Sequence, residues 1–263
     1  MNLRGSWALV RSTWSSWMQY RGFFFVLAFG WMLPPLAAYF VWAASAGSQQ
    51  MGGYTRAAFA GYYLVLILVN QFTYAQANWT LGDVIRGGQL NFWLIRPLPA
   101  LMNVLSAEAA GKTVTLAFVV PAAALCALVL QPELTTSGPQ AAWFIASLLM
   151  AWALRFLWGC ALAMLAFWST RADALLALQD ALIFILAGVV APISLLPDWL
   201  QTAARFLPFR YMVGFPVEIL TAPLNPAELL GGFAIQTGWL LLAAAATTLL
   251  WQRGLKRYYA IGG

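Results

Sequence analysis

The chain has 263 residues, of which 62% are hydrophobic and 8% are charged. Soluble domains carry about 25% charged residues, so this composition excludes an ordinary soluble enzyme. The net charge of +6 does not indicate a nucleic-acid-binding protein, because Lys and Arg flank apolar stretches instead of lining a polar face. No nucleic acid is therefore expected as a partner.

Residues 1–21 precede the first long apolar stretch and repeat apolar side chains at helical spacing. Arg4 and Arg11 lie away from this apolar face. A Trp-rich face with basic residues opposite predicts an amphipathic helix in the membrane interface, and an irregular tail with aromatic anchors is the alternative. The apolar face consists of Leu3, Trp7, Val10, Trp14, Trp17 and Met18.

Six apolar stretches follow, and each is long enough for a helix to cross about 30 Å of hydrocarbon. Backbone inside a bilayer must satisfy its own hydrogen bonds, so the stretches are predicted to be helices. No polar segment is long enough to fold separately, so residues 1–263 are predicted to form a single domain of an all-α integral membrane protein. The predicted spans are Phe23–Ala44, Ala57–Trp79, Leu101–Leu130, Ala141–Trp168, Ala174–Ala191 and Leu229–Trp251.

Lys and Arg residues indicate the orientation. With the N-terminus inside, ten of the fourteen lie in inner segments, three lie in outer segments, and Arg155 lies within a span. Positive residues concentrate on the cytoplasmic side of membrane proteins, so both termini are predicted to be cytoplasmic.

The second span carries five polar residues in its inner half, which a helix surrounded by lipid would not carry. They are predicted to join helices through hydrogen bonds or to line a wet cavity, and ordinary bundle packing is the alternative. The five residues are Asn70, Gln71, Thr73, Gln76 and Asn78.

The segment between the second and third spans covers residues 80–100. Its apolar residues predict a short helix that ends at the pair Gly87-Gly88, and Pro97 and Pro99 stop any further helix. The segment is predicted to dock a partner or to be an ordered surface loop.

Charged residues inside the third, fourth and fifth spans are predicted to pair. The run Ser106–Thr113 ends like a phosphate-binding loop, but no strand precedes it, so Lys112 is predicted to pair with Glu108 one turn earlier. An Arg in mid-span is costly, so Arg155 is predicted to pair with Asp180. The pair serves either a transport pathway or the packing of two helices.

Residues 192–228, before the last span, hold short apolar pieces bounded by prolines. Pro197 is predicted to start a helix, Pro208 to end it, and Pro216–Thr221 to form another helical turn. Because irregular backbone at membrane depth must be covered by protein, the segment is predicted to be a re-entrant helical cap on the outer side.

The chain has no His, and Cys126 and Cys160 both fall within apolar spans. The sequence shows no carboxylate pair, no nucleophile with a base, and no metal-ligand cluster within a span. We therefore predict no catalytic, cofactor or metal site, and a chain that is not an enzyme by itself.

The layout and two local motifs resemble the permease subunits of bacterial ABC type-2 exporters. The run Gly87–Pro99 resembles the inner-loop motif of one branch, and Leu207–Leu220 resembles its cap motif. Asn91 stands where the branch often has Asp. The resemblance implies an inner-membrane exporter in which two identical or related permeases pair, and a separate ATPase dimer holds ATP and Mg²⁺.

The resemblance also implies roles for particular residues. The inner loop couples to the ATPase, here through Leu81, Asp83, Val84, Ile85 and Arg86. The pathway is lined mainly by the first, second and fifth spans, and the implied substrate is an amphiphilic or hydrophobic small molecule such as a drug, toxin or natural product. Together with Arg155, the candidate pathway residues are Phe29, Trp31, Tyr62, Asn70, Phe72 and Asp180.

Two other functions are open at the level of the sequence. One is a secondary, ion-coupled transporter, although the halves show no convincing internal repeat. The other is a membrane scaffold that transports nothing.

Overall fold

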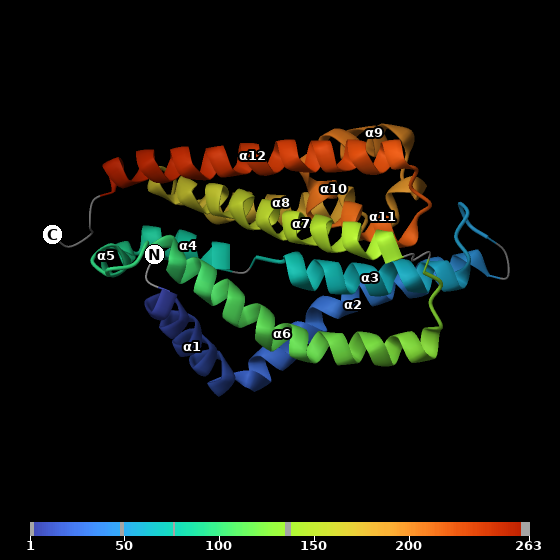
Figure 1. The fold of residues 1–263 in the computed structure, drawn as a ribbon, viewed down its shortest axis with the longest axis horizontal. Helices are drawn as coiled ribbons and strands as arrows, with labels where there is room; N and C mark the ends of the chain where they lie inside the picture. The colour runs from blue at the N-terminus through green and yellow to red at the C-terminus, as the bar shows by residue number, and fades with distance from the viewer. Residues whose placement is uncertain (1–2, 48–49, 76, 135–137, 259–263) are drawn as a thin grey trace.

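The computed structural model describes residues 3–47, 50–75, 77–134 and 138–258. Apart from an isolated bridge between Met51 and Tyr54, regular structure in these residues is helical, which confirms the all-α fold class. The elements (Figure 1) are α1 (Leu3–Gln19), α2 (Arg21–Ala46), α3 (Arg56–Thr73), α4 (Ala77–Arg86), α5 (Leu90–Leu94), α6 (Leu101–Leu130), α7 (Gly138–Met164), η1 (Leu165–Phe167), α8 (Ala172–Leu186), η2 (Ile193–Leu195), α9 (Asp198–Phe206), α10 (Pro208–Met212), α11 (Gly214–Thr221) and α12 (Pro226–Arg257).

Four helical segments of the described residues have the length and hydropathy to cross a bilayer: Arg56–Arg86, Leu101–Leu130, Gly138–Phe167 and Pro226–Arg257. They match the predicted second, third, fourth and sixth spans. Helix α2 has 26 residues and covers the predicted first span. Helix α8 has 15 residues and is about 22 Å long at 1.5 Å per residue. The number of spans therefore stays a prediction.

Helix α8 ends five residues before the predicted end of the fifth span at Ala191. The chain turns at Gly188, whose φ of +83° favours glycine. The Tyr62 hydroxyl donates to the Gly188 carbonyl (2.8 Å), and Tyr63 and Trp42 donate to the Val190 carbonyl. These three donors satisfy carbonyl groups that a longer helix would have satisfied itself.

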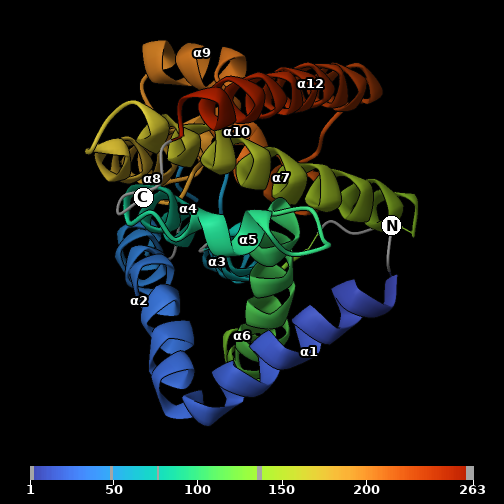
Figure 2. The same cartoon turned by 90° about the vertical axis from the view of Figure 1, so that its left-hand side faces the viewer.

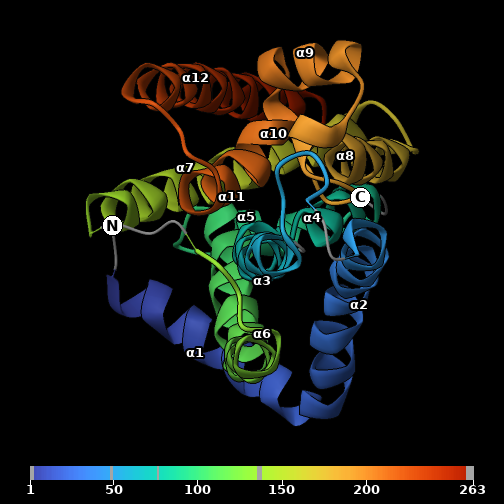
Figure 3. The same cartoon turned by 90° about the vertical axis from the view of Figure 1, so that its right-hand side faces the viewer.

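Helix α3 forms the core of the bundle. Figure 3 shows it end-on, surrounded by α2, α6, α7 and α11, which all pack against it. Its residues from Phe59 to Ile67 are buried on every side, as expected for a helix that is apolar all round. Helix α12 packs along α7 at one side of the molecule.

The predicted second span is not one continuous helix. Helix α3 ends at Thr73, Tyr74 has an extended ψ of 126°, and α4 starts at Ala77. Gln76, one of the five predicted polar residues, lies outside the described residues. The break divides the predicted span into the core helix α3 and the shorter helix α4.

The predicted N-terminal helix is present as α1, except that residues 1–2 lie outside the described part. Helix α1 lies against α6 (Figure 2). The Trp17 ring packs on Gly111, where a Cβ atom would lie 2.5 Å from the ring. Trp7 and Trp14 are exposed. Their position in the membrane interface stays a prediction.

Residues 192–228 contain the short helices predicted at Pro197 and at Pro216–Thr221. Helix α9 follows Pro197, Pro208 ends it and starts α10, and α11 covers the predicted turn at Pro216–Thr221. Most of α10 and α11 is buried against α7 and α8. These helices therefore close one end of the bundle.

Candidate functional site at the break in the second span

Arg155 of α7 lies buried beside the break between α3 and α4. Its Nη1 atom donates to Asn70 Oδ1 (2.8 Å) and to Thr73 Oγ1 (3.2 Å). Its guanidinium group stacks over the Tyr74 ring at 5.1 Å from the centroid. Its Nη2 atom lies 3.6 Å from Asp180 Oδ1 of α8, which confirms the predicted pair. One side chain thus joins three helices.

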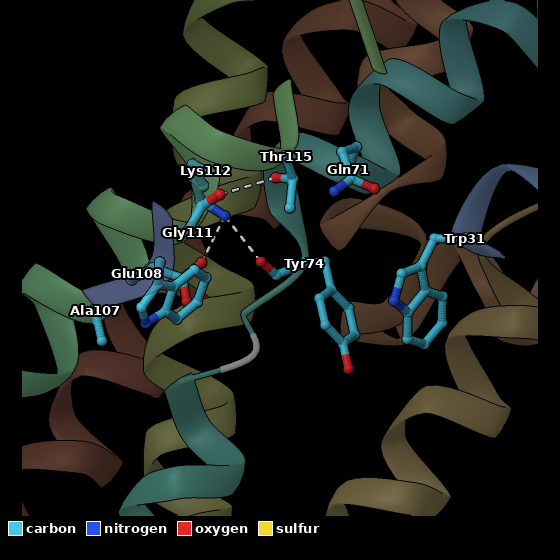
Figure 4. A pocket seen from close by; sticks show the side chains of 9 residues that line it. Trp31, Gln71, Tyr74, Ala107, Glu108, Gly111, Lys112 and Thr115 are labelled. Atoms are coloured by element: carbon cyan, nitrogen blue, oxygen red, sulfur yellow. Dashed lines mark hydrogen bonds and ion pairs between the residues drawn. The ribbon is translucent and has the colours of Figure 1, made fainter. Parts of the chain in front are cut away.

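Lys112 of α6 also reaches the break, where it lies beside Tyr74 (Figure 4). Its Nζ atom lies 2.5 Å from Glu108 Oε1, which confirms the second predicted pair. The same ammonium group donates to the Tyr74 carbonyl (2.8 Å) and lies 5.8 Å from the Phe72 ring centroid. Because Ser106–Thr113 lies within α6, it has no loop that could cradle a phosphate.

The two cations meet the carboxyl end of α3. The last carbonyl groups of a helix lack internal partners, and they carry the negative end of the helix dipole. Lys112 satisfies one such carbonyl directly, and Arg155 binds two side chains of the last turn. This arrangement explains why the span breaks at Tyr74 without a proline or glycine there.

A small cavity lies beside the Lys112–Glu108 pair. It holds about 20 Å³, which is room for about one water molecule. Figure 4 shows the Trp31 and Tyr74 rings packed side by side in its wall, with centroids 4.7 Å apart. The cavity is therefore closed to an amphiphile in this conformation. Its lining residues are Trp17, Trp31, Gln71, Tyr74, Ala107, Glu108, Gly111, Lys112 and Thr115.

The structure gathers some predicted pathway residues and separates others. Asn70, Arg155 and Asp180 form one cluster, with Trp31 and Phe72 close to its neighbours Tyr74 and Lys112. Phe29 packs elsewhere, in an apolar cluster with Met32, Ile67 and Val119. Tyr62 is fully buried, and its hydroxyl caps the turn after α8.

The predicted coupling residues divide into two sets. Leu81, Val84 and Ile85 are buried in the protein's own core, and the Asp83 side chain is exposed. Arg86 donates to Asp173 Oδ1 (2.7 Å) and to the Thr170 carbonyl (2.9 Å). These bonds fasten α4 to the junction between α7 and α8.

Sequence reasoning missed the exposed apolar residues in the segment 80–100, the predicted inner loop. Phe92 is 64% exposed and Ile95 is 80% exposed, and Leu94 lies between them. They fall inside the motif Gly87–Pro99, whose apolar content was the available signal.

Arg86 also lowers the pKa of the exposed Asp173 carboxyl through its hydrogen bond, so that this carboxylate stays ionised.

Within the described residues, no three His, Cys, Asp or Glu side chains come together to hold a metal ion. The site consists of ion pairs, amides and aromatic rings. Such groups can bind and release a ligand or change partners, but they supply no nucleophile paired with a base. The fold and the site therefore define a polytopic helical membrane protein with a buried charge network.

The model of the ABC-2 family transporter proteins matches residues 30–262. The chain therefore belongs to this family and is a transporter membrane subunit. Neither the curated proteins nor the solved structures gave a match to the chain.

Proposed function

We propose that the chain is the permease subunit of an ATP-driven exporter in the bacterial inner membrane, with both termini in the cytoplasm. Two copies, or one copy and a related chain, enclose a pathway for an amphiphilic or hydrophobic small molecule. A separate ATPase dimer binds ATP and Mg²⁺ and drives the cycle. This chain binds no nucleotide.

The partial exposure of Asp180 carries the proposal. Asp180 lies in the middle of the apolar helix α8, and its side chain is 29% exposed in the single chain. A carboxylate that faces hydrocarbon is costly, so a charged group at this depth faces protein or a water-filled space. A pathway between α8 and a second permease would place both protein and a water-filled space beside Asp180.

The break in the second span supports a conformational role for the same network. Helix α3 is packed in the core, and α4 is fastened to the inner ends of α7 and α8. A force on the inner loop moves α4 relative to α3, and the Lys112 and Arg155 contacts lie at the joint. We therefore assign the network to the change between closed and open states.

The inner loop supports contact with the ATPase. The buried Leu81, Val84 and Ile85 anchor α4 in the permease. The exposed side chains that can meet a partner include Asp83, Phe92, Leu94 and Ile95. An exposed apolar patch of this kind is typical of a protein–protein contact.

Reconstitution with the ATPase tests the proposal. Liposomes that contain both subunits are expected to export a fluorescent amphiphile only with ATP and Mg²⁺. The Asp180→Asn variant is expected to lose transport roughly tenfold, corresponding to about 1.4 kcal/mol in the barrier. Asp198→Asn, which changes an exposed carboxylate on α9, is the matched control.

Cross-linking completes the experiment. The Ile95→Cys variant is expected to form a cross-link with the ATPase. The Trp199→Cys variant, with its cysteine in the cap, is expected to form none. Transport by the chain alone on an ion gradient contradicts the proposal, as does full transport by Asp180→Asn.

A further inference from the structure

A second cavity lies among the cap helices α9, α10 and α11. Figure 1 shows these helices at the end of the bundle opposite α4 and α5. The cavity holds about 160 Å³, which is the space of about five water molecules at 30 Å³ each. Its walls come from the loop before α3, from α3 itself, from η2, α9, α10 and α11, and from the segment between α11 and α12. The lining residues are Tyr54, Tyr62, Ile193, Ser194, Gln201, Arg205, Arg210, Glu218, Ala222 and Leu224.

A tight turn positions Tyr54 at this cavity. Met51 and Tyr54 exchange two backbone hydrogen bonds of 3.0 Å. Gly52 and Gly53 between them have φ angles of +58° and +86°, which a two-residue hairpin turn requires. The turn packs on Leu195. Burial raises the pKa of Tyr54, so its hydroxyl stays protonated and available as a donor at neutral pH.

The cavity is lined by two positively charged residues, Arg205 and Arg210, and one negatively charged residue, Glu218. Arg210 and Glu218 satisfy each other, because Arg210 Nη2 lies 2.5 Å from Glu218 Oε2 and Nε donates to both carboxylate oxygens at 3.2 Å. The ion pairs among the described residues leave Arg205 without a carboxylate partner. The cavity therefore presents one positive charge in excess and a guanidinium group with unused donors.

The remaining walls suit an amphiphile. Ile193, Ala222 and Leu224 give the cavity an apolar side. Trp199 and Phe206 of α9 are each 70% exposed, and Trp is enriched at the boundary between membrane and water. A ligand in the cavity thus has a charged contact and an apolar contact within reach.

We propose that this outer cavity binds the anionic head group, phosphate or carboxylate, of an amphiphile. Arg205 holds the oxygen atoms with its planar pair of N–H groups, a geometry that Lys does not offer. The Tyr54 hydroxyl adds a neutral donor. The head group belongs either to a membrane lipid or to a free amphiphile. The site requires neither ATP nor transport, so it goes beyond the export function.

Binding of decyl phosphate to the full chain in phosphatidylcholine nanodiscs tests the proposal. Saturable binding is expected, and Arg205→Gln is expected to weaken it ~10-fold, the scale of a hydrogen bond between charged groups. Glu218→Gln is expected to strengthen it, because Arg210 loses its carboxylate. Arg56→Gln, which removes another exposed cation near the same end of α3, is expected to bind as the wild type does.

Nanodiscs that contain phosphatidylglycerol distinguish a membrane lipid from a free amphiphile as the source of the anionic head group. Competition with decyl phosphate identifies a lipid head group, and absence of competition identifies a free amphiphile. Equal binding of decyltrimethylammonium, unchanged affinity in Arg205→Gln, or an equal loss in Arg56→Gln overturns the proposal. None of these results bears on export, which is measured separately with the ATPase.

Discussion

The two ends of the bundle hold their buried charges in different ways. At the break in the second span, Arg155 and Lys112 link α3, α6, α7 and α8, and the cavity beside them holds about 20 Å³. In the cap, Arg210 and Glu218 are eight residues apart on adjacent short helices, beside a cavity of about 160 Å³. The inner charges join elements that are distant in the sequence, whereas the outer pair stabilises one local unit.

This difference indicates which contacts between charged residues must change when the protein changes conformation. Arg210 and Glu218 both belong to the cap, so a movement of other helices relative to the cap leaves this pair intact. Helices α3, α6, α7 and α8 cannot move relative to one another unless the inner contacts change. Substitutions in the inner network are therefore expected to have larger effects than substitutions in the cap.

The largest effect is expected from Arg155→Leu. The change leaves Asp180 without its cation and Asn70 without its donor. Loss of one member of a buried pair costs about 3–5 kcal/mol, so the variant is expected to unfold at a much lower temperature in detergent. In the double variant with Asp180→Asn, part of the loss is expected to return. A loss of stability below about 1 kcal/mol, the value of an exposed ion pair, contradicts the expectation that the inner network has the larger effects.

A smaller effect is expected from Gly111→Ala, which tests the link between α1 and the inner network. The new methyl group would lie 2.5 Å from the Trp17 ring, and overpacking of this kind costs about 1–3 kcal/mol. Displacement of α1 is expected to be visible as faster hydrogen exchange in residues 3–19.

Gly238→Ala in α12 is the control for this variant, because a Cβ atom there meets nothing within 4 Å. It is expected to be neutral or slightly stabilising. If the two alanine variants behave alike, α1 is not held by Trp17.

Glu218→Gln tests the outer end. Both side chains of the pair are partly exposed, so we expect a cost of about 1.5 kcal/mol, at the low end for hydrogen bonds to charged groups. Water access to a cysteine placed at residue 71, beside the inner cavity, is expected to stay unchanged. An altered rate of labelling there would show that the two ends are coupled.

The smallest effect is expected from Asp173→Asn, at the exposed contact between α4 and α8. The pKa of Asp173 is lowered below its usual 3.8, so its contribution to stability is present above about pH 4 and is lost as the pH falls through the folded pKa. The variant is therefore expected to unfold slightly earlier than the wild type at pH 7. At pH 3 and below the difference is expected to shrink. A difference that grows on acidification contradicts this assignment.

Much of the fold followed from local chemistry. Prolines predicted the limits of α9, and the turn predicted at Pro216–Thr221 lies within α11, which starts two residues earlier. Gly87-Gly88 predicted the end of α4. Helix α10 was not predicted. The ion pairs of Lys112 and Arg155 followed from the cost of a lone charge in a span. Each of these predictions used residues close in sequence or one strong energetic rule.

The rest depended on contacts that the sequence does not display. The break at Tyr74 forms without a proline or glycine. It is stabilised instead by Lys112 and Arg155, which reach it from two other helices. The early end of α8 depends on donors from α2 and α3. The burial of Leu81, Val84 and Ile85, which separates anchoring from contact in the inner loop, also required the packed structure.

The bond from Lys112 ends on a main-chain oxygen of Tyr74. Every residue type has that oxygen, so related chains are free to change the side chain at position 74 and still keep the joint. Correlated substitutions, which depend on two side chains changing together, will not reveal this contact. A survey of relatives should instead look for a basic residue that persists at position 112 while position 74 varies.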